Sequence, residues 1–184
     1  MRAIRAGDGV ELDNGDADAD AAPADAPVLR VVKGETYEDV YRADYARMVR
    51  VAHMLTGSNE AAEDIVQDAF VGLYPRFNAL DDPGGYLYRS VVNGCWSRHR
   101  RRRVVERFRH LTDQTASADV ATDEIDETWT ALMRLPNRQR AVIVLRYYAD
   151  LPLSDIAEIL GCKTGTVKSM LHRALAQLKE VIRR

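Results

Sequence analysis

The sequence predicts an all-α protein built from two small helical domains joined by a flexible acidic linker. Three observations lead to this prediction. In most of the chain, apolar residues recur at the three- and four-residue spacing of an amphipathic helix. The periodicity lapses over 104–124, where the composition turns polar and acidic. It then resumes and ends in two helical patterns separated by Gly161 and Cys162, which is typical of a helix-turn-helix within a four-helix domain.

Composition narrows the class of protein. The chain has 184 residues, of which 46% are hydrophobic, enough for one medium domain or two small ones. No apolar run reaches the roughly 18 residues that span a bilayer, and the N-terminus lacks an apolar signal core, so we expect a cytoplasmic protein without membrane insertion. Cys95 and Cys162 lie far apart without a CxxC partner, so we expect neither a zinc site nor a disulfide, and no cofactor.

The net charge of -2 conceals a strong segregation of charge. Residues 1–27 carry seven acidic and two basic side chains, and 112–128 carry six acidic and no basic ones. In contrast, 98–109 hold seven arginines, and 161–184 hold six basic residues against one acidic residue. Two separate basic patches predict two contacts with a polyanion.

The N-terminal residues 1–33 are rich in Ala, Asp, Gly and Pro and have no apolar periodicity. We therefore expect a disordered acidic extension. Two roles fit this composition. In the first, the extension shields the basic patches or binds a partner. In the second, it only makes the chain more soluble.

Apolar stripes mark the first two helices, over 37–55 and 62–73. Gly57 suits a C-terminal cap of the first, and Ser58 or Asn59 can cap the second. The second helix has an acidic outer face of Glu63, Asp64, Gln67 and Asp68. Close carboxylates also occur at metal and acid–base sites, but no histidine or third ligand joins this pattern. A face for solvent or for a basic partner is therefore favoured.

A third helix is expected from about Tyr86 past Arg98, after a loop at 77–85 that contains Asp-Pro-Gly-Gly. Its inward positions are Leu87, Val91 and Cys95. Aromatic and amide side chains precede the arginine run, which suits stacking of splayed bases above a neutralised backbone. An arginine run alone also fits a solvated helix end, but the aromatic residues and the second basic element favour nucleic-acid binding.

The C-terminal domain is expected to hold four helices. One begins at Trp129 and ends before Pro136, another follows over 141–148, and the helix-turn-helix occupies 153–178. Its last helix turns inward Val167, Met170, Leu171, Ala174, Leu175 and Leu178, and has a polar face of Lys163, Thr164, Thr166, Lys168, Ser169, His172 and Arg173. An ordinary helical hairpin with a solvated basic face is the alternative. The coincidence of turn, core spacing and polar face favours contacts with phosphates and major-groove bases.

Four segments together resemble the extracytoplasmic-function (ECF) sigma factors of the sigma-70 family, which act with bacterial RNA polymerase. They are AEDIVQDAF (62–70), GYLYRSVVNGCWSRHRRRR (85–103), LPNRQRAVIVLRYYADLPLSDIAEILGC (135–162) and GTVKSMLHRALAQL (165–178). The resemblance covers about 37–103 and 125–182. It implies a region 2-like domain over 34–103 and a region 4-like domain over 125–184.

The resemblance also implies partners and roles. The chain would bind core polymerase through the largest-subunit clamp and the beta flap, recognise promoter DNA, and meet an anti-sigma factor, while its linker would thread channels that otherwise hold RNA. The clamp would contact Asp64, Gln67, Asp68 and Phe70. The minus-10 element would contact Phe77, Tyr88, Arg89, Asn93, Trp96, Arg98, Arg100 and Arg101, with a flipped base between Phe77 and Asn93. The minus-35 element would contact Lys163, Thr164, Thr166, Lys168, Ser169, His172 and Arg173.

The chain departs from the family pattern at Met170 and Leu175, where many relatives have Arg, and in the DDPGG loop, which lacks the common polar-basic pattern. Both departures bear on which promoter sequence is preferred.

Two other functions fit parts of the sequence. A stand-alone helix-turn-helix regulator that binds operators as a dimer needs only the C-terminal half and leaves the arginine-rich third helix unexplained. A nucleic-acid-processing enzyme needs metal ligands or a nucleophile, and His53, His99, His110 and His172 form no ligand pattern. We therefore expect a sigma factor that is not itself an enzyme.

Overall fold

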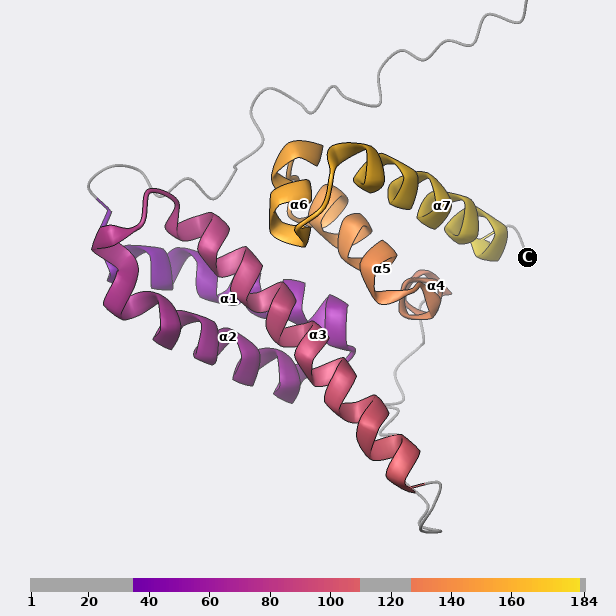
Figure 1. The fold of residues 1–184 in the computed structure, drawn as a ribbon, viewed down its shortest axis with the longest axis horizontal. Helices are drawn as coiled ribbons and strands as arrows, with labels where there is room; N and C mark the ends of the chain where they lie inside the picture. The colour runs from indigo at the N-terminus through magenta and orange to yellow at the C-terminus, as the bar shows by residue number, and fades with distance from the viewer. Residues whose placement is uncertain (1–34, 110–126, 183–184) are drawn as a thin grey trace, which may run out of the picture.

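The computed structural model describes residues 35–109 and 127–182, and for 104–109 and 181–182 it describes the backbone alone. The expected N-terminal extension and residues 110–124 of the expected linker lie outside the described residues. Every regular element in the described part is helical, which confirms the all-α prediction (Figure 1). In order, the elements are α1 (Tyr37–Thr56), α2 (Asn59–Leu73), the 3-10 helix η1 (Tyr74–Ala79), α3 (Pro83–Arg109), α4 (Glu127–Arg134), α5 (Asn137–Ile143), the π-helical turn η2 (Val144–Tyr148), α6 (Leu153–Leu160) and α7 (Thr164–Ile182).

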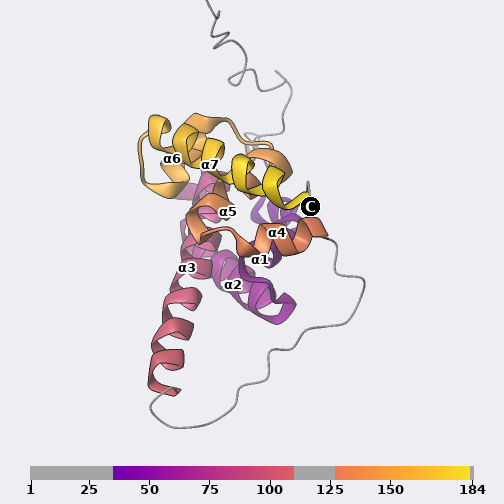
Figure 2. The same ribbon diagram turned by 90° about the vertical axis from the view of Figure 1, so that its right-hand side faces the viewer.

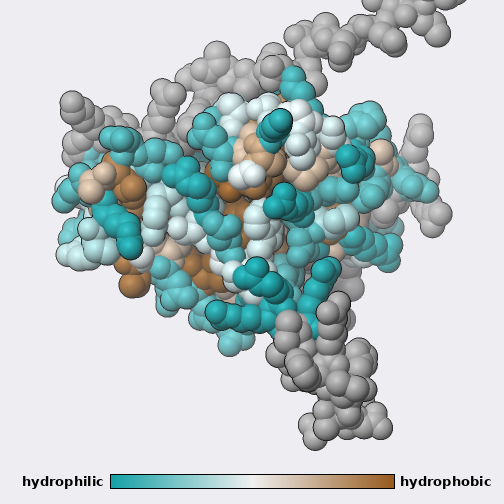
Figure 3. Space-filling view, viewed as in Figure 1, coloured by the Kyte–Doolittle hydropathy of each residue, from teal (hydrophilic) through white to brown (hydrophobic). Residues whose placement is uncertain are grey.

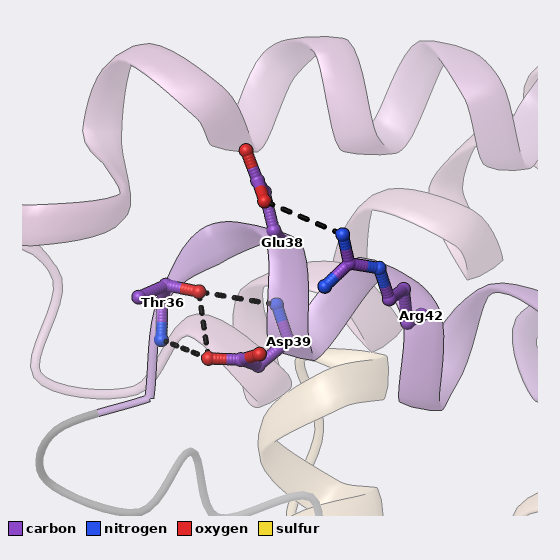
Figure 4. A network of polar contacts seen from close by, with 4 residues as sticks. All are labelled: Thr36, Glu38, Asp39 and Arg42. Atoms are coloured by element: carbon purple, nitrogen blue, oxygen red, sulfur yellow. Dashed lines mark hydrogen bonds and ion pairs between the residues drawn. The ribbon is translucent and has the colours of Figure 1, made fainter.

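Local hydrogen bonds fix both ends of α1. Thr36 and Asp39 form a capping box, in which each side chain accepts the backbone N–H of the other residue (Figure 4). At the other end, Gly57 adopts a left-handed conformation with φ of 76°, and its N–H bonds the carbonyl of His53. Ser58 then caps α2 by accepting from the N–H of Ala61. Both predicted caps are confirmed.

Helices α1, α2 and α3 pack around one apolar core. α2 and α3 approach closely at Gly94, where a Cβ atom would come within 2.7 Å of the Cγ2 atom of Ile65. Buried residues of these helices include Met48, Val51, Val66, Phe70, Leu73, Leu87 and Val91. Tyr41 belongs to the apolar stripe over 37–55 but is 40% exposed, because it lies at the edge of an aromatic cluster formed with Tyr37 and Phe70.

Helix α3 is longer at both ends than the sequence suggests. It begins at Pro83, inside the expected loop, where the Asp82 carboxylate accepts the N–H of Gly85. It continues to Arg109, beyond the expected domain end at Arg103. The far end of α3 projects away from the other helices in both ribbon views (Figures 1 and 2).

The C-terminal helices form the predicted four-helix domain, with α5 continued by the η2 turn. Helices α6 and α7 make the helix-turn-helix. Gly161 ends α6 with φ of 61°, and no atom lies within 4 Å of the place where its Cβ would be. Gly161 is therefore needed for its left-handed backbone and not for space.

The two domains pack directly against each other. α3 contacts α6, and α1 contacts both α5 and η2, so that the buried apolar residues form one continuous cluster through both domains. Tyr88, an expected minus-10 contact, is 1% exposed. The reason is that α3 packs against α1 and α2 and also against the C-terminal domain, so that little of the helix surface is exposed to solvent.

Candidate nucleic-acid interface

The N-terminal half of α7 presents a continuous polar face, which we call the α7 face. All of the predicted minus-35 residues are exposed: Lys163, Thr164, Thr166, Lys168, Ser169, His172 and Arg173. They surround a helix N-terminus, where the first-turn backbone N–H groups and the helix dipole favour anions. The face therefore combines cations, hydroxyls and N–H donors, the groups that bind phosphates and base edges.

The opposite side of α7 holds this face outward. Val167 and Ala174 are completely buried, and Met170 and Leu171 are each 8% exposed. Met170, one of the two departures from the family pattern, thus packs into the domain, and Leu175 is half-buried against the same core. Periodic burial along one side of α7 determines which residues point to solvent.

The third helix carries the second basic surface, which we call the α3 surface. Asn93, Arg98, Arg100 and Arg101 are exposed, whereas Arg89 and Trp96 are half-buried. Hydrophilic side chains gather at the base of the projecting end of α3 in the space-filling view (Figure 3). This surface offers charge for a phosphate backbone and one amide that can pair with a base edge.

The remaining two predicted minus-10 residues are buried. Phe77 of η1 is 9% exposed, and its ring meets the ring of Tyr37 edge-on at 5.9 Å between centroids. Burial raises the pKa of Tyr88 to about 12, and its hydroxyl has no hydrogen-bond partner. Neither ring is open to a stacking base in this arrangement of the chain.

The acidic face of α2 is exposed at Glu63, Asp64, Gln67 and Asp68. Asp64 lies 3.8 Å from the guanidinium of Arg98, in a solvent-exposed pair that binds weakly. Phe70, predicted as a polymerase contact, is 1% exposed and packs among tyrosine rings, so its role is to support the helix. Among the described residues, no group of acidic, histidine or cysteine side chains could hold a metal ion.

Sequence reasoning missed two exposed apolar residues beside this face. Val71 is 71% exposed and Tyr74 is 68% exposed. Val71 lies seven residues after Asp64 and therefore on the same side of α2. That spacing was the available signal, but neither residue was assigned to the core or to a site.

Two family models match this chain, one over each helical domain. The family model described as Sigma-70 region 2 matches residues 40–105, and the model described as Sigma-70, region 4 matches residues 125–178. The ECF RNA polymerase sigma factor SigM of Mycobacterium tuberculosis (strain ATCC 25618 / H37Rv) is 31% identical over 86% of this chain and 85% of its own length. The chain belongs to the ECF sigma factors.

Other relatives agree with this assignment. The RNA polymerase sigma-E factor of Streptomyces coelicolor is 30% identical over 78% of this sigma factor and 84% of the relative. The fold matches that of the sigma factor RpoE solved in complex with the anti-sigma factor NepR from Bartonella quintana, with a TM-score of 0.67, 23% identity, and coverage of 80% of this chain and 96% of that one.

The chain is thus an alternative sigma factor, a class of protein that directs promoter recognition and transcription initiation. Within the described part of this sigma factor, no helix is long and apolar enough to cross a membrane.

Proposed function

We propose that this sigma factor binds core RNA polymerase and divides promoter recognition between its two basic surfaces. The α7 face reads the minus-35 element as duplex, and the α3 surface takes up the opened strand of the minus-10 element. The observation that carries the proposal is that all seven polar residues of the α7 face are exposed, above a buried apolar side.

The chemistry of the α7 face supports duplex recognition. Thr164 and Thr166 lie in the first turn of α7, beside N–H groups that favour a phosphate. Lys168, His172 and Arg173 follow at helical spacing and are long enough to reach base edges in a major groove. The Ser169 hydroxyl donates to the carbonyl of Gly165 at 3.0 Å and keeps its lone pairs for an incoming donor.

The chemistry of the α3 surface supports binding of an opened strand. Arg98, Arg100 and Arg101 follow Asn93 along one exposed helix, so cationic groups continue from the one amide suited to a base edge. A flipped base held between Phe77 and Asn93 remains part of the proposal. Because Phe77 is nearly buried, that contact requires a movement of η1 or of its aromatic neighbours.

The acidic face of α2 supports docking on a basic partner. Asp64, Gln67 and Asp68 are exposed within one helical turn, and we assign them to the clamp of the polymerase largest subunit. The C-terminal domain is assigned to the beta flap. An anti-sigma factor is proposed as a further partner, because the sigma factor RpoE, which shares this fold, was solved in complex with the anti-sigma factor NepR.

Mapping of transcript start sites tests the proposal. Purified core polymerase is incubated with a genomic promoter library, with and without this chain. We expect a set of start sites that appear only with the chain and that share two upstream sequence blocks. Binding of the chain to duplex operators without polymerase, together with an unchanged set of start sites, would contradict it and would favour a stand-alone regulator.

A further inference from the structure

Two large apolar side chains lie open to solvent beside the acidic face of α2. Val71 is 71% exposed and Tyr74 is 68% exposed, more than any other large apolar residue in the described part of the chain. We call these two residues the apolar pair. Val71 follows Asp68 by three residues on α2, so the pair continues the line of exposed carboxylates along that side of the helix. Exposed apolar residues next to polar ones are typical of a surface that binds another segment or protein.

The described chain begins next to the apolar pair. Tyr37 is the first residue of α1, and its ring meets the ring of Tyr74 edge-on at 5.0 Å between centroids. The Tyr37 hydroxyl donates to the carbonyl of Phe70 at 3.1 Å, which ties the start of α1 to the last turn of α2. The residues that precede α1 are therefore attached to the molecule beside the apolar pair.

The sequence just before α1 has a composition that complements this surface. Residues 28–32 read VLRVV, which places four apolar side chains around Arg30, and Lys33 follows directly. The run holds no acidic residue, in contrast to the seven in 1–27. We call 28–32 the pre-α1 segment. Its apolar side chains suit the apolar pair, and its cation suits the neighbouring carboxylates of α2.

The length of the connection permits a contact between the two. The pre-α1 segment lies outside the described part of the chain, which begins at Glu35. Leu29 precedes Glu35 by six residues, and an extended chain spans about 3.3 to 3.6 Å per residue, so Leu29 can lie up to about 20 Å from that point. A short connection also keeps the segment at a high local concentration near the apolar pair, so that even weak contacts hold it there.

We propose that the pre-α1 segment packs over Val71 and Tyr74 and brings Arg30 to the carboxylates of the acidic face of α2. The functional consequence rests on the proposed docking of that face on core polymerase, because the segment and the basic clamp then compete for one surface. Binding of polymerase displaces the segment. The apparent affinity for polymerase equals the intrinsic affinity multiplied by the fraction of molecules in which the segment is undocked.

Disulfide trapping in the full chain tests the contact. In a Cys162→Ser background, which leaves only the buried Cys95, one variant carries Leu29→Cys with Val71→Cys and the matched control carries Leu12→Cys with Val71→Cys. Bridge formation is followed in a buffer of oxidised and reduced glutathione. The two bridges close loops of about 40 and about 60 residues, so loop closure alone predicts rates within about twofold of each other. We expect the Leu29 pair to form its bridge about tenfold faster than the control, because docking raises the local concentration of the thiol.

The charge of the segment provides a second test of the same contact. Arg30→Glu, added to the Leu29 pair, places an acid against the carboxylates of α2 and is expected to slow bridge formation several-fold. Arg5→Glu makes the same change of charge far from the segment and is expected to leave the rate unchanged. Equal rates for the Leu29 and Leu12 pairs would overturn the proposal. Bridges that join two molecules instead of closing within one would also overturn it, in favour of a second copy of the chain on this surface.

Binding to core polymerase separates this inference from the proposed function. The bridged Leu29 pair is compared with the same chain after reduction, and we expect the bridged form to bind core polymerase about tenfold more weakly or worse. Unchanged binding of the bridged form, together with weaker binding of Asp64→Lys, would overturn the competition and leave the proposed docking face standing. If neither change weakens binding, the proposed polymerase contact of α2 fails, while fast bridge formation still supports the docked segment.

Discussion

Arg140 joins both domains from an almost buried position. Its guanidinium donates to the carbonyls of Leu132, Met133 and Leu135 at the turn between α4 and α5, and to Leu55 at the end of α1. Helix ends leave such carbonyls without partners, so one cation satisfies groups that otherwise need water. Burial lowers the pKa of Arg140, but a guanidinium stays charged at neutral pH. The local sequence NRQR (137–140) does not indicate which of its two arginines is buried.

Replacement of Arg140 tests this role. Arg140→Leu is expected to lower the free energy of unfolding by about 3 kcal/mol or more, because buried carbonyls lose their donor. Urea unfolding followed by circular dichroism measures the loss. Arg134→Ala, an exposed arginine of α4, is the control and should change stability by less than about 0.5 kcal/mol. Equal stability of the two variants would contradict the role.

Two glycines in helices make a matched pair with opposite expected effects. Gly94→Ala is expected to destabilise the protein by about 1 to 3 kcal/mol, since the new methyl would lie 2.7 Å from Ile65. Gly165→Ala in α7 meets no atom within 4 Å, so better helix propensity should stabilise it by about 0.5 to 1 kcal/mol. The melting temperatures of both variants are measured against that of the parent protein. A shift of the same sign in both variants would refute the close approach of α2 and α3.

At the scale of the element, local sequence predicts most of this molecule. The caps at Gly57 and Ser58, the turn at Gly161 and the outward face of α7 all follow from residue types at fixed spacing. The limits of α3 do not follow from the local sequence. A proline such as Pro83 is typical of loops and also of the first turn of a helix, so it does not show where α3 begins. Its arginine run likewise carries no stop signal before Arg109.

Helix α7 provides a direct test of minus-35 recognition. Arg173→Ala is expected to weaken binding to the minus-35 element by about 1 to 3 kcal/mol, as the loss of one specific base contact does. Gln177→Ala, an exposed residue one turn further along, is the control. Occupancy by the polymerase–sigma complex is measured on a series of upstream sequence variants. Unchanged occupancy across the whole series for Arg173→Ala would remove the residue from the interface.

Helix α2 provides the test of polymerase docking. Asp64→Lys reverses one charge on the exposed acidic face and is expected to weaken association with core polymerase by about tenfold or more, through like-charge repulsion with a basic partner. Co-purification with core enzyme is the measurement, with helical content as the check of folding. Glu38→Lys, an exposed acid of α1, is the control. Equal recovery of core enzyme with both variants would reject the assignment of this face.

At the scale of the whole molecule, the sequence predicts two helical domains but not how they meet. Arg47 and Ala149 are bonded although about a hundred residues separate them, and nothing in the local pattern of either residue marks it as a contact. The burial of Tyr88 and the contact of Trp96 with Arg138 are likewise not predictable from the sequence. Helical periodicity within one domain does not show which of its residues a second domain will cover. Of the candidate site, the α7 face is therefore predicted more completely than the α3 surface.

The central claim is that the two basic surfaces act together on one promoter when core polymerase is present. Permanganate footprinting at a start site that depends on this chain tests it most directly, because the reagent modifies unpaired thymines. We predict reactive thymines at the minus-10 element only when core polymerase and the chain are both present, and loss of that reactivity with either Arg173→Ala or Arg98→Ala combined with Arg100→Ala. Reactivity that persists without the chain, or that neither substitution reduces, would contradict the account.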